Sequence, residues 1–395
     1  MNIKMNVKNN VEVWGGMECT INRIGNTYVD QLELAGHYTR KNDLELLPSL
    51  GIRALRYPIL WEKYQPVKNE EIDFGSLPAN LLKLKQQNIE PIAGLLHHGS
   101  GPAFTNLLDD NFPFMFAEFA AKVARRFTFV EYFTPINEPL TTARFSGLYG
   151  HWYPHHCNEF SFLKMLLNQL KGVVLAMHEI RKIIPAAKLI QTEDLAKVFS
   201  TPVMKYQADF ENIRRWLTFD ILSGHLTIEH PFWKYIIDTG IPVSMLDFFQ
   251  KNPCTPDILG VNYYITSERY LEENVKKYPF EMKDRNNFDL YDDTEAVRVE
   301  INKKTGLKER LKEIWFKYRL PIAVTEIHIN CHREEQMRWF YEAWKDCVDL
   351  RNNGVDIRAI TAWSLFGSFG WDRLLTGEQF KYETGVFDIS SGKLR

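Results

Sequence analysis

The sequence predicts a single (β/α)8 barrel that spans residues 1–395. Strand-like and helix-like segments alternate about eight times along the chain, and polar or aromatic residues gather where the predicted strands end. Parallel sheets with such connections form either barrels or doubly wound sheets. The number of repeats in one chain, with no Gly-x-Gly-x-x-Gly after the first strand, favours the barrel.

The barrel strands are predicted from short apolar segments that are bounded by turn or polar residues. The fourth segment is an aromatic run that continues toward Asn137 and Glu138. In chain order, the predicted strands are 11–16, 52–58, 89–96, 127–133, 188–191, 258–264, 321–326 and 357–363.

Segments with helical periodicity separate these strands. Residues 41–50 end at Gly51, a typical C-cap residue, and residues 160–184 are stopped by Pro185. Residues 267–306 are polar, charged and poorly periodic, which predicts a long loop over the barrel mouth with room for a hairpin. The other predicted helices are 77–87, 112–127, 210–222, 307–318 and 334–350.

The composition excludes several classes of function. A net charge of −2 gives no reason to expect a nucleic acid or an anionic membrane as a partner. The five cysteines are scattered and contain no Cys-x-x-Cys pair, which favours reduced thiols over a disulfide framework or a zinc site. Residues 1–10 are polar, and no apolar run reaches the length of a membrane span, so we expect a cytoplasmic protein.

Two stretches end in a glutamate at the predicted carboxyl end of a strand. One contains Asn137, Glu138 and Pro139, and the other ends at Glu326. Glycoside hydrolysis requires such a pair, with one carboxyl group as proton donor and the other as its partner. Either glutamate alone is better explained as a surface residue at a strand end, whereas the pair with its flanking residues favours catalysis.

Six motifs occur in order along most of the chain. They are Leu-Arg-Tyr-Pro-Ile-Leu-Trp at 55–61, Leu-His-His at 96–98, Thr-Pro-Ile-Asn-Glu-Pro at 134–139, Leu-Gly-Val-Asn-Tyr-Tyr at 259–264, Val-Thr-Glu at 324–326 and Trp-Ser-Leu at 363–365. Together they resemble the motifs of glycoside hydrolase family 1, the β-glucosidase-like retaining enzymes. None of the motifs is decisive by itself, but their shared order makes the resemblance specific.

The resemblance implies that Glu326 is the nucleophile and Glu138 the acid/base. Arg56 and Tyr264 are expected to keep Glu326 charged, through an ion pair and a phenolic hydrogen bond. Glu138, with no comparable cation, is expected to stay protonated. The other implied substrate-binding residues are Asn137 on the sugar 2-hydroxyl, together with His98, Asn262, Trp363 and Trp371. Neither a metal nor a cofactor is expected.

Several of these residues also have ordinary structural explanations. Taken alone, His97 or His98 is more often a satisfied core histidine than a ligand, and a lone tryptophan is more often part of the core. Three histidines between residues 151 and 156 follow the acid/base loop, but their spacing matches no standard metal pattern. Glu193 and Asp194, after the fifth strand, are expected to be peripheral.

The chain departs from the family pattern where that family grips the outer sugar hydroxyls. The recognition Glu of the family falls at Gly370, its first-strand Gln falls at Asn22, and its Asn-Gly after the nucleophile becomes Ile327-His328. A missing side chain at position 370 should leave room and remove a negative charge, which predicts an altered glycone specificity. We expect a sugar that is modified or lacks a hydroxyl at its outer positions, or one that carries an anionic group.

A phosphorylated sugar is the less favoured form of that expectation. Residues 376–378 and Lys381 resemble phospho-glycosidases faintly, but the Ser of those enzymes is missing at Gly370.

The sequence therefore predicts a cofactor-free retaining glycosidase that acts on a small β-linked glycoside or glycoconjugate. Two alternatives stay open. The lost recognition Glu suggests a carbohydrate-binding barrel without turnover, although both catalytic glutamates are present. The same carboxylates could also serve a transglycosylase of polysaccharide or nucleotide-sugar metabolism.

Overall fold

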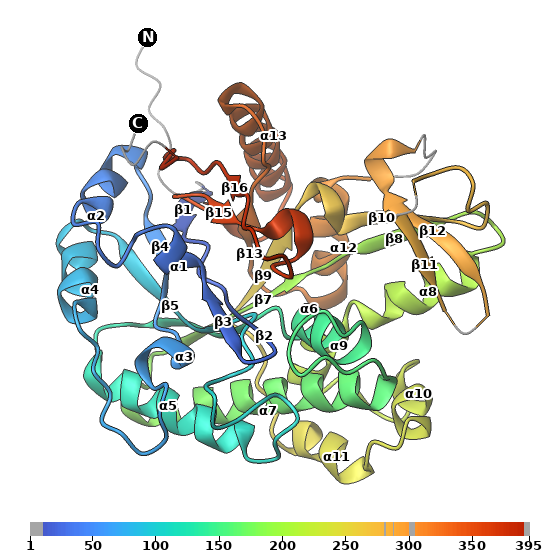
Figure 1. The fold of residues 1–395 in the computed structure, drawn as a ribbon, viewed down its shortest axis with the longest axis horizontal. Helices are drawn as coiled ribbons and strands as arrows, with labels where there is room; N and C mark the ends of the chain where they lie inside the picture. Colours follow the sequence, from blue (N-terminus) through green and yellow to red (C-terminus); the bar gives the residue numbers. More distant parts are fainter. Residues whose placement is uncertain (1–10, 280–281, 287, 300–304, 391–395) are drawn as a thin grey trace.

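The computed structural model describes residues 11–279, 282–286, 288–299 and 305–390. Its centre is a closed barrel of parallel strands, in the order β1-β14-β13-β9-β7-β6-β5-β4, with helices packed around it (Figure 1). The predicted (β/α)8 barrel is therefore confirmed. Its strands are β1 Glu12–Gly16, β4 Ala54–Pro58, β5 Glu90–His97, β6 Tyr132–Asn137, β7 Lys188–Asp194, β9 Ile258–Tyr263, β13 Ile322–Ile327 and β14 Ile357–Ala362.

Helices follow the barrel strands, as the alternation of patterns predicts. Some connections carry more than one helix, because long excursions separate β6 from β7 and β7 from β9. The helices are α1 Gln31–Leu34, α2 Asp43–Leu46, α3 Trp61–Tyr64, α4 Leu77–Gln86, α5 Phe112–Arg126, α6 Pro139–Ala143, α7 Glu159–Ile183, α8 Lys205–Arg214, α9 Leu217–Leu222, α10 Trp233–Asp238, α11 Val243–Lys251, α12 Leu307–Tyr318 and α13 Arg333–Asn352.

Three predicted elements differ from the structure. The fourth strand begins at Tyr132, and residues 127–131 form a connection whose apolar side chains Phe127 and Val130 are buried. A buried connection has the same composition as a buried strand, which explains the error. Residues 210–222 divide into α8 and α9, and residues 41–50 form α2 followed by a 3-10 turn that closes at Gly51 with φ of 65°.

Residues 267–306 contain more regular structure than the predicted loop. Within the described part of this segment, β10 Glu268–Glu272, β11 Lys283–Arg285 and β12 Leu290–Glu295 join β8 Lys197–Ser200 in a sheet of order β11-β12-β10-β8. This sheet lies beside the barrel, at the right of Figure 1. Its partner strand β8 lies far earlier in the chain, so a local reading of the sequence does not reveal the pairing.

Two short antiparallel pairs lie at the carboxyl end of the barrel. The first is the hairpin of β2 Ile21–Ile24 and β3 Thr27–Asp30, directly after β1. The second pairs β15 Ser368–Phe369 with β16 Tyr382–Glu383, after β14. Both pairs therefore come from the segments that follow neighbouring strands of the barrel, β1 and β14.

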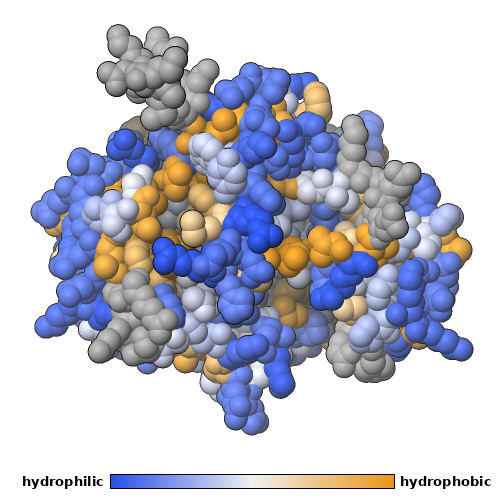
Figure 2. Space-filling model, turned by 90° about the horizontal axis from the view of Figure 1, so that it is seen from above, coloured by the Kyte–Doolittle hydropathy of each residue, from blue (hydrophilic) through white to orange (hydrophobic). Residues whose placement is uncertain are grey.

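The main core lies between the barrel and its surrounding helices, with α5 and α7 packed side by side. Helix α7 is long and apolar enough to cross a membrane by length and composition alone, but 78% of that stretch is buried inside the protein. The face shown in Figure 2 is mostly hydrophilic and carries separate hydrophobic patches. The apolar character of α7 is accordingly explained by packing inside a folded domain.

Candidate active site

The two predicted glutamates lie at the carboxyl ends of barrel strands. Glu138 follows β6, and Glu326 is the next-to-last residue of β13. Their exposed fractions are only 5% and 2%. In a (β/α)8 barrel this end of the strands is where sites are built, so both carboxyl groups lie where catalysis would require them.

Glu326 is held by a cation and a phenol. Nη1 of Arg56, on β4, lies 2.7 Å from Oε1 of Glu326, and the hydroxyl of Tyr264 donates to Oε2. Burial nevertheless raises the pKa of Glu326 to about 7, against the lowering effect of Arg56 and Tyr264. The expected partners are therefore present, but they restrain the effect of burial without cancelling it.

Glu138 has different surroundings. Nδ2 of Asn262 donates to its Oε1 at 2.6 Å, and Nε2 of His98 lies 3.8 Å from its Oε2. Burial, followed by the negative charges of Glu326, Asp194 and Glu193, raises the pKa of Glu138 well above its usual value. The protonated form of this carboxyl group is therefore favoured, as a general acid requires.

Asn137 connects the surroundings of the two glutamates. Its Oδ1 accepts from Nη2 of Arg56 at 2.7 Å and from the hydroxyl of Thr192 at 2.8 Å, with Nδ2 of Asn262 at 3.4 Å. Asn137 is 1% exposed. One amide thus fixes a partner of Glu326 and a partner of Glu138 in the same network.

The two neighbouring histidines are neutral hydrogen-bonding groups. Burial lowers the pKa of His98 to about 3 and the pKa of His97 well below its usual value. Nδ1 of His98 lies 3.0 Å from the hydroxyl of Thr142, and Nε2 of each histidine lies within 3.4 Å of Nδ2 of Asn137. The core and the ligand interpretations of His98 are therefore compatible, because this residue is buried and also borders Glu138.

Aromatic side chains form a wall beside these polar groups. The Trp363 ring covers the guanidinium of Arg56 at 4.5 Å and stacks on His97 at a centroid distance of 5.3 Å. Trp371 meets His98 edge to face at 5.7 Å, and Trp152 lies 5.3 Å from His98. The structure thus brings all of the predicted site residues into one cluster, and it adds Trp152, which no motif indicated.

Glu193 and Asp194 are not peripheral, contrary to the prediction. Glu193 is fully buried and accepts from the backbone N–H of Leu140 at 3.0 Å and the hydroxyl of Thr218 at 2.6 Å. Both residues end β7 and raise the pKa of Glu138 by their charge. Their position at the end of a barrel strand was the available signal.

Two residues of the cluster, and a third beside it, adopt the left-handed backbone conformation. The φ angles are 54° for His98, 44° for Glu138 and 57° for Ser364. His98 and Glu138 directly follow β5 and β6, and Ser364 comes two residues after the end of β14. Non-glycine residues in this region store roughly 1–3 kcal/mol of strain each, and such residues concentrate at functional sites. Pro139 then opens α6, as its fixed φ favours.

The space beside Gly370 is filled, which corrects one part of the specificity prediction. Gly370 has a φ of 74°, and a Cβ atom built there would lie 2.5 Å from the ring of Phe380. The missing side chain therefore leaves no open room at this point. Asn22, the other altered position, lies on β2 and is 1% exposed.

The histidines after the acid/base loop do not converge. His155 accepts from the backbone N–H of Gly25 at 3.0 Å, His156 bonds the Ser161 hydroxyl, and His151 packs on Phe145. Across the described ranges, no group of three His, Cys, Asp or Glu side chains is arranged to hold a metal ion.

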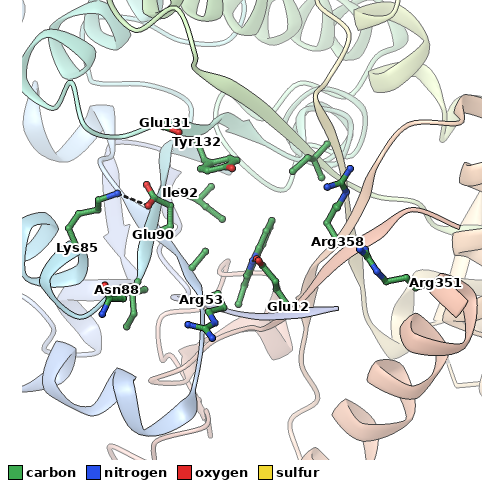
Figure 3. A pocket seen from close by; sticks show the side chains of 14 residues that line it. Glu12, Arg53, Lys85, Asn88, Glu90, Ile92, Glu131, Tyr132, Arg351 and Arg358 are labelled. Atoms are coloured by element: carbon green, nitrogen blue, oxygen red, sulfur yellow. Dashed lines mark hydrogen bonds and ion pairs between the residues drawn. The ribbon is translucent and has the colours of Figure 1, made fainter. Parts of the chain in front are cut away.

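A separate cavity of about 630 Å³ lies at the opposite, amino end of the barrel. Figure 3 shows its charged rim, including Arg53, Arg358 and the ion pair between Lys85 and Glu90. Neither of the two predicted catalytic glutamates lines this cavity. The site is thus defined by the converging polar groups and not by this cavity.

A buried pair of carboxyl groups at the mouth of a (β/α)8 barrel, with aromatic walls and neutral amides, defines a glycosidase. The family model for glycosyl hydrolase family 1 matches residues 18–383. The chain belongs to this family.

Relatives agree with that assignment. Aryl-phospho-beta-D-glucosidase BglC of Bacillus subtilis (strain 168) is 22% identical over 409 aligned positions, which cover 88% of this chain and 80% of the relative. Beta-glucosidase 4 of Oryza sativa subsp. japonica is 33% identical, but over only 31% of this chain and 27% of its own.

Solved structures share the fold. The beta-glucosidase from Thermotoga maritima in complex with glucoimidazole aligns with a TM-score of 0.75 and 16% identity, covering 97% of this chain and 94% of the other. The AHE enzyme from Alicyclobacillus herbarius aligns with a TM-score of 0.71 and 18% identity, covering 91% and 84%.

Proposed function

We propose that this glycosidase cleaves β-linked glycosides with retention of configuration, with Glu326 as nucleophile and Glu138 as acid/base. The observation that carries the proposal is the difference between the surroundings of the two carboxyl groups. Arg56 and Tyr264 favour the charged form of Glu326, whereas further negative charges favour the protonated form of Glu138. Retaining hydrolysis needs this division of protonation states.

The reaction then proceeds in two displacements. The carboxylate of Glu326 attacks the anomeric carbon while the bond to the leaving oxygen breaks, and Glu138 gives its proton to that oxygen. The ionised Glu138 next takes a proton from water, whose oxygen attacks the anomeric carbon and releases Glu326. Asn137, held by Arg56 and Thr192, is placed to bond the sugar 2-hydroxyl, a contact that strengthens in the transition state.

An altered glycone specificity is part of the proposal. Gly370 offers no acceptor for a sugar hydroxyl, and Phe380 occupies the adjoining space. A relative is named as an aryl-phospho-β-D-glucosidase, which makes a 6-phosphoglucoside a necessary test substrate. Lys381, the cation suggested by the sequence for a phosphate, is exposed, so a phosphorylated glycone is the less favoured choice.

Covalent labelling tests the proposal directly. A 2-deoxy-2-fluoro-β-glycosyl fluoride should trap the intermediate, and peptide mapping should place the label on Glu326. Proton NMR of the first product should show the β-anomer, because two displacements retain configuration. A label on another residue would reject the nucleophile, and an α-anomer as first product would reject retention. Glu326→Gln should lose activity by orders of magnitude while its melting temperature stays near that of the wild type.

A further inference from the structure

A third buried carboxyl group lies at the same rim of the barrel. Glu18 follows β1 and is 6% exposed, a value close to the 5% of Glu138 and equal to the 6% of Arg56. Neither the strand pattern nor the motifs indicated a role for this residue. A buried glutamate is normally paired with a cation. Among the described residues, no Lys, Arg or His side chain lies within ion-pair distance of Glu18, so its burial needs another explanation.

The two oxygens of Glu18 are used unequally. Oε1 accepts from the backbone N–H of Thr20 at 3.0 Å and from the Thr20 hydroxyl at 2.7 Å. Among the side chains of the described residues, Oε2 accepts from Nε1 of Trp363, at a long distance of 3.3 Å, and the backbone N–H of Cys19 also bonds the carboxyl group of Glu18. Since each carboxylate oxygen can accept about two hydrogen bonds and the bond from Trp363 is long, Oε2 can still accept a donor at a shorter distance.

Trp363 connects Glu18 to the catalytic groups. Its ring covers Arg56, which is paired with Glu326, and its N–H points at Glu18. Gly16 permits this arrangement, because a Cβ atom there would lie 2.3 Å from the Trp363 ring. The position of Glu18 relative to the nucleophile is therefore fixed by packing between β1 and the residue that follows β14.

We propose that Glu18 is a specificity-determining residue, whose Oε2 accepts a hydrogen bond from a glycone hydroxyl other than the 2-hydroxyl. A sugar hydroxyl is the donor that the under-used oxygen lacks, and the carboxylate of Glu18 takes over a recognition role that Gly370 cannot fill. The inference rests on the proposed function, because it assumes that the glycone lies between Trp363 and Glu326.

The charge of Glu18 also narrows the class of substrate. Burial raises the pKa of Glu18 itself, and where Glu18 is ionised its negative charge contributes to the raised pKa of Glu326 and of Glu383. Glu383 pairs with Ser368, close in the chain to Gly370. An anionic group on the glycone would therefore approach the carboxyl groups of Glu18 and Glu383 as well as the Arg56–Glu326 pair, so a neutral polyhydroxylated sugar is the expected substrate, in preference to an anionic one.

A merely structural role for Glu18 predicts a different result from a recognition role. If Glu18 only holds Trp363, its substitution should slow all substrates by the same factor. If Oε2 bonds a hydroxyl, the loss should disappear for the substrate that lacks this hydroxyl. The two explanations are separated by a double-mutant-type cycle, in which the loss of kcat/KM caused by the protein substitution is compared between the parent sugar and its deoxy forms.

The test compares wild type and Glu18→Gln on 4-nitrophenyl β-glycosides. The substrates are the parent sugar that the wild type cleaves best and its 3-, 4- and 6-deoxy forms. We expect kcat/KM for the parent to fall by about 10- to 100-fold, the usual range for a lost hydrogen bond to a charged group. For one deoxy form the fall should be less than about 3-fold. An equal loss for every substrate would overturn the proposal.

A second comparison uses the 6-phosphoglucoside as an anionic substrate. The wild type should cleave it less efficiently than the neutral parent, and Glu18→Gln should narrow that difference by about 10-fold, because it removes a nearby negative charge. An unchanged difference would overturn the charge argument. If Glu18→Gln does not fold, Glu18→Asp keeps the charge, shortens the side chain by one methylene, and should show the same pattern across the deoxy substrates.

Glu12→Gln is the matched control. Glu12 is the first residue of β1, the strand that Glu18 follows, and it accepts a hydrogen bond from the indole N–H of Trp14 at 2.8 Å as Glu18 does from Trp363. We expect Glu12→Gln to leave the substrate pattern unchanged.

Failure of the proposed function would give a different result from failure of the Glu18 proposal. The wild type would then cleave no β-glycoside, and calorimetric binding of the same sugars to wild type and Glu18→Gln would decide the role of Glu18. An equal affinity of both proteins for every sugar would overturn it.

Discussion

The side-chain amide of Asn262 donates a hydrogen bond of 2.6 Å to Oε1 of Glu138. The carbonyl of the same amide accepts from the hydroxyl of Thr325, the residue before Glu326. One asparagine on β9 therefore orients a carboxyl group that follows β6 and contacts the strand that carries the other one.

Asn262→Ala should shift the basic limb of the kcat/KM profile to higher pH. The lost hydrogen bond favours the ionised form of Glu138, so its removal raises the pKa of this group further. The value of kcat/KM at the optimum should fall by about 10- to 100-fold, because the proton donor loses its orientation. A pH profile with an unmoved basic limb would contradict this role of Asn262.

Arg56→Met should move the acidic limb to higher pH and lower kcat/KM by more than about a thousandfold. The guanidinium opposes the effect of burial on Glu326, whose pKa is already raised to about 7, so its loss favours the protonated and non-nucleophilic form. Arg56→Lys keeps the charge but not the bonds to both Glu326 and Asn137. The lysine variant should therefore be slow with an acidic limb near that of the wild type. Coincident profiles of the two variants would show that charge is not the cause.

Glu138→Gly should be more stable than Glu138→Ala, by about 1 kcal/mol in the free energy of unfolding. Residue 138 has a φ of 44°, where glycine has no steric penalty and alanine does. Thermal unfolding compares the two proteins. Both should be inactive on poor leaving groups, and azide should rescue both on good ones with formation of a β-glycosyl azide. A more stable alanine variant would show that the backbone relaxes without cost.

Glu62→Gln should remove part of the pH dependence of stability. Glu62 is 7% exposed, its Oε1 accepts from the N–H of Gly101 at 3.0 Å, and burial raises its pKa to about 8. The folded protein therefore binds this proton more tightly than the unfolded chain. The resulting stabilisation is complete below the usual pKa of 4.5 and is lost as the pH rises through about 8.

The comparison uses chemical denaturation at two pH values. At pH 5 the glutamine variant and the wild type should be nearly equal in stability. At pH 9 the variant should be more stable by on the order of 2 kcal/mol. Glu45→Gln, on an exposed pair with Lys83, should show no such difference and serves as control. Equal stabilities of variant and wild type at both pH values would mean that Glu62 titrates normally.

The barrel was predictable because its strands carry a local signal. A parallel strand that is buried on both faces reads as a continuous apolar run, and seven of the eight runs agree with the observed strands within a few residues. The fourth run failed at residues 127–131, where a buried connection has the same composition. The pairing of β8 with β10 depends on residues far apart in the chain, which periodicity does not report.

The site was predictable where motifs mark it, at both glutamates and their partners. Glu18 was not recognised, since a lone carboxyl group after β1 has no local signature and its significance depends on Trp363 at the other end of the chain. Phe380 was missed for a similar reason, because only the folded loop brings it to Gly370. Burial is also the main cause of the raised pKa of Glu326, and no sequence pattern gives the extent of that burial.

The strand order has a consequence for how the catalytic apparatus is distributed along the chain. Glu138, Asn137 and His98 come from the first half of the chain, and Glu326 and Asn262 come from the second. A cut anywhere between Asp194 and Ile258 would give two fragments, each with only one of the two catalytic carboxyl groups. Turnover by a mixture of such fragments would require that they reassemble into the closed eight-stranded barrel. Neither fragment would be active alone, so glycoside cleavage would report their association.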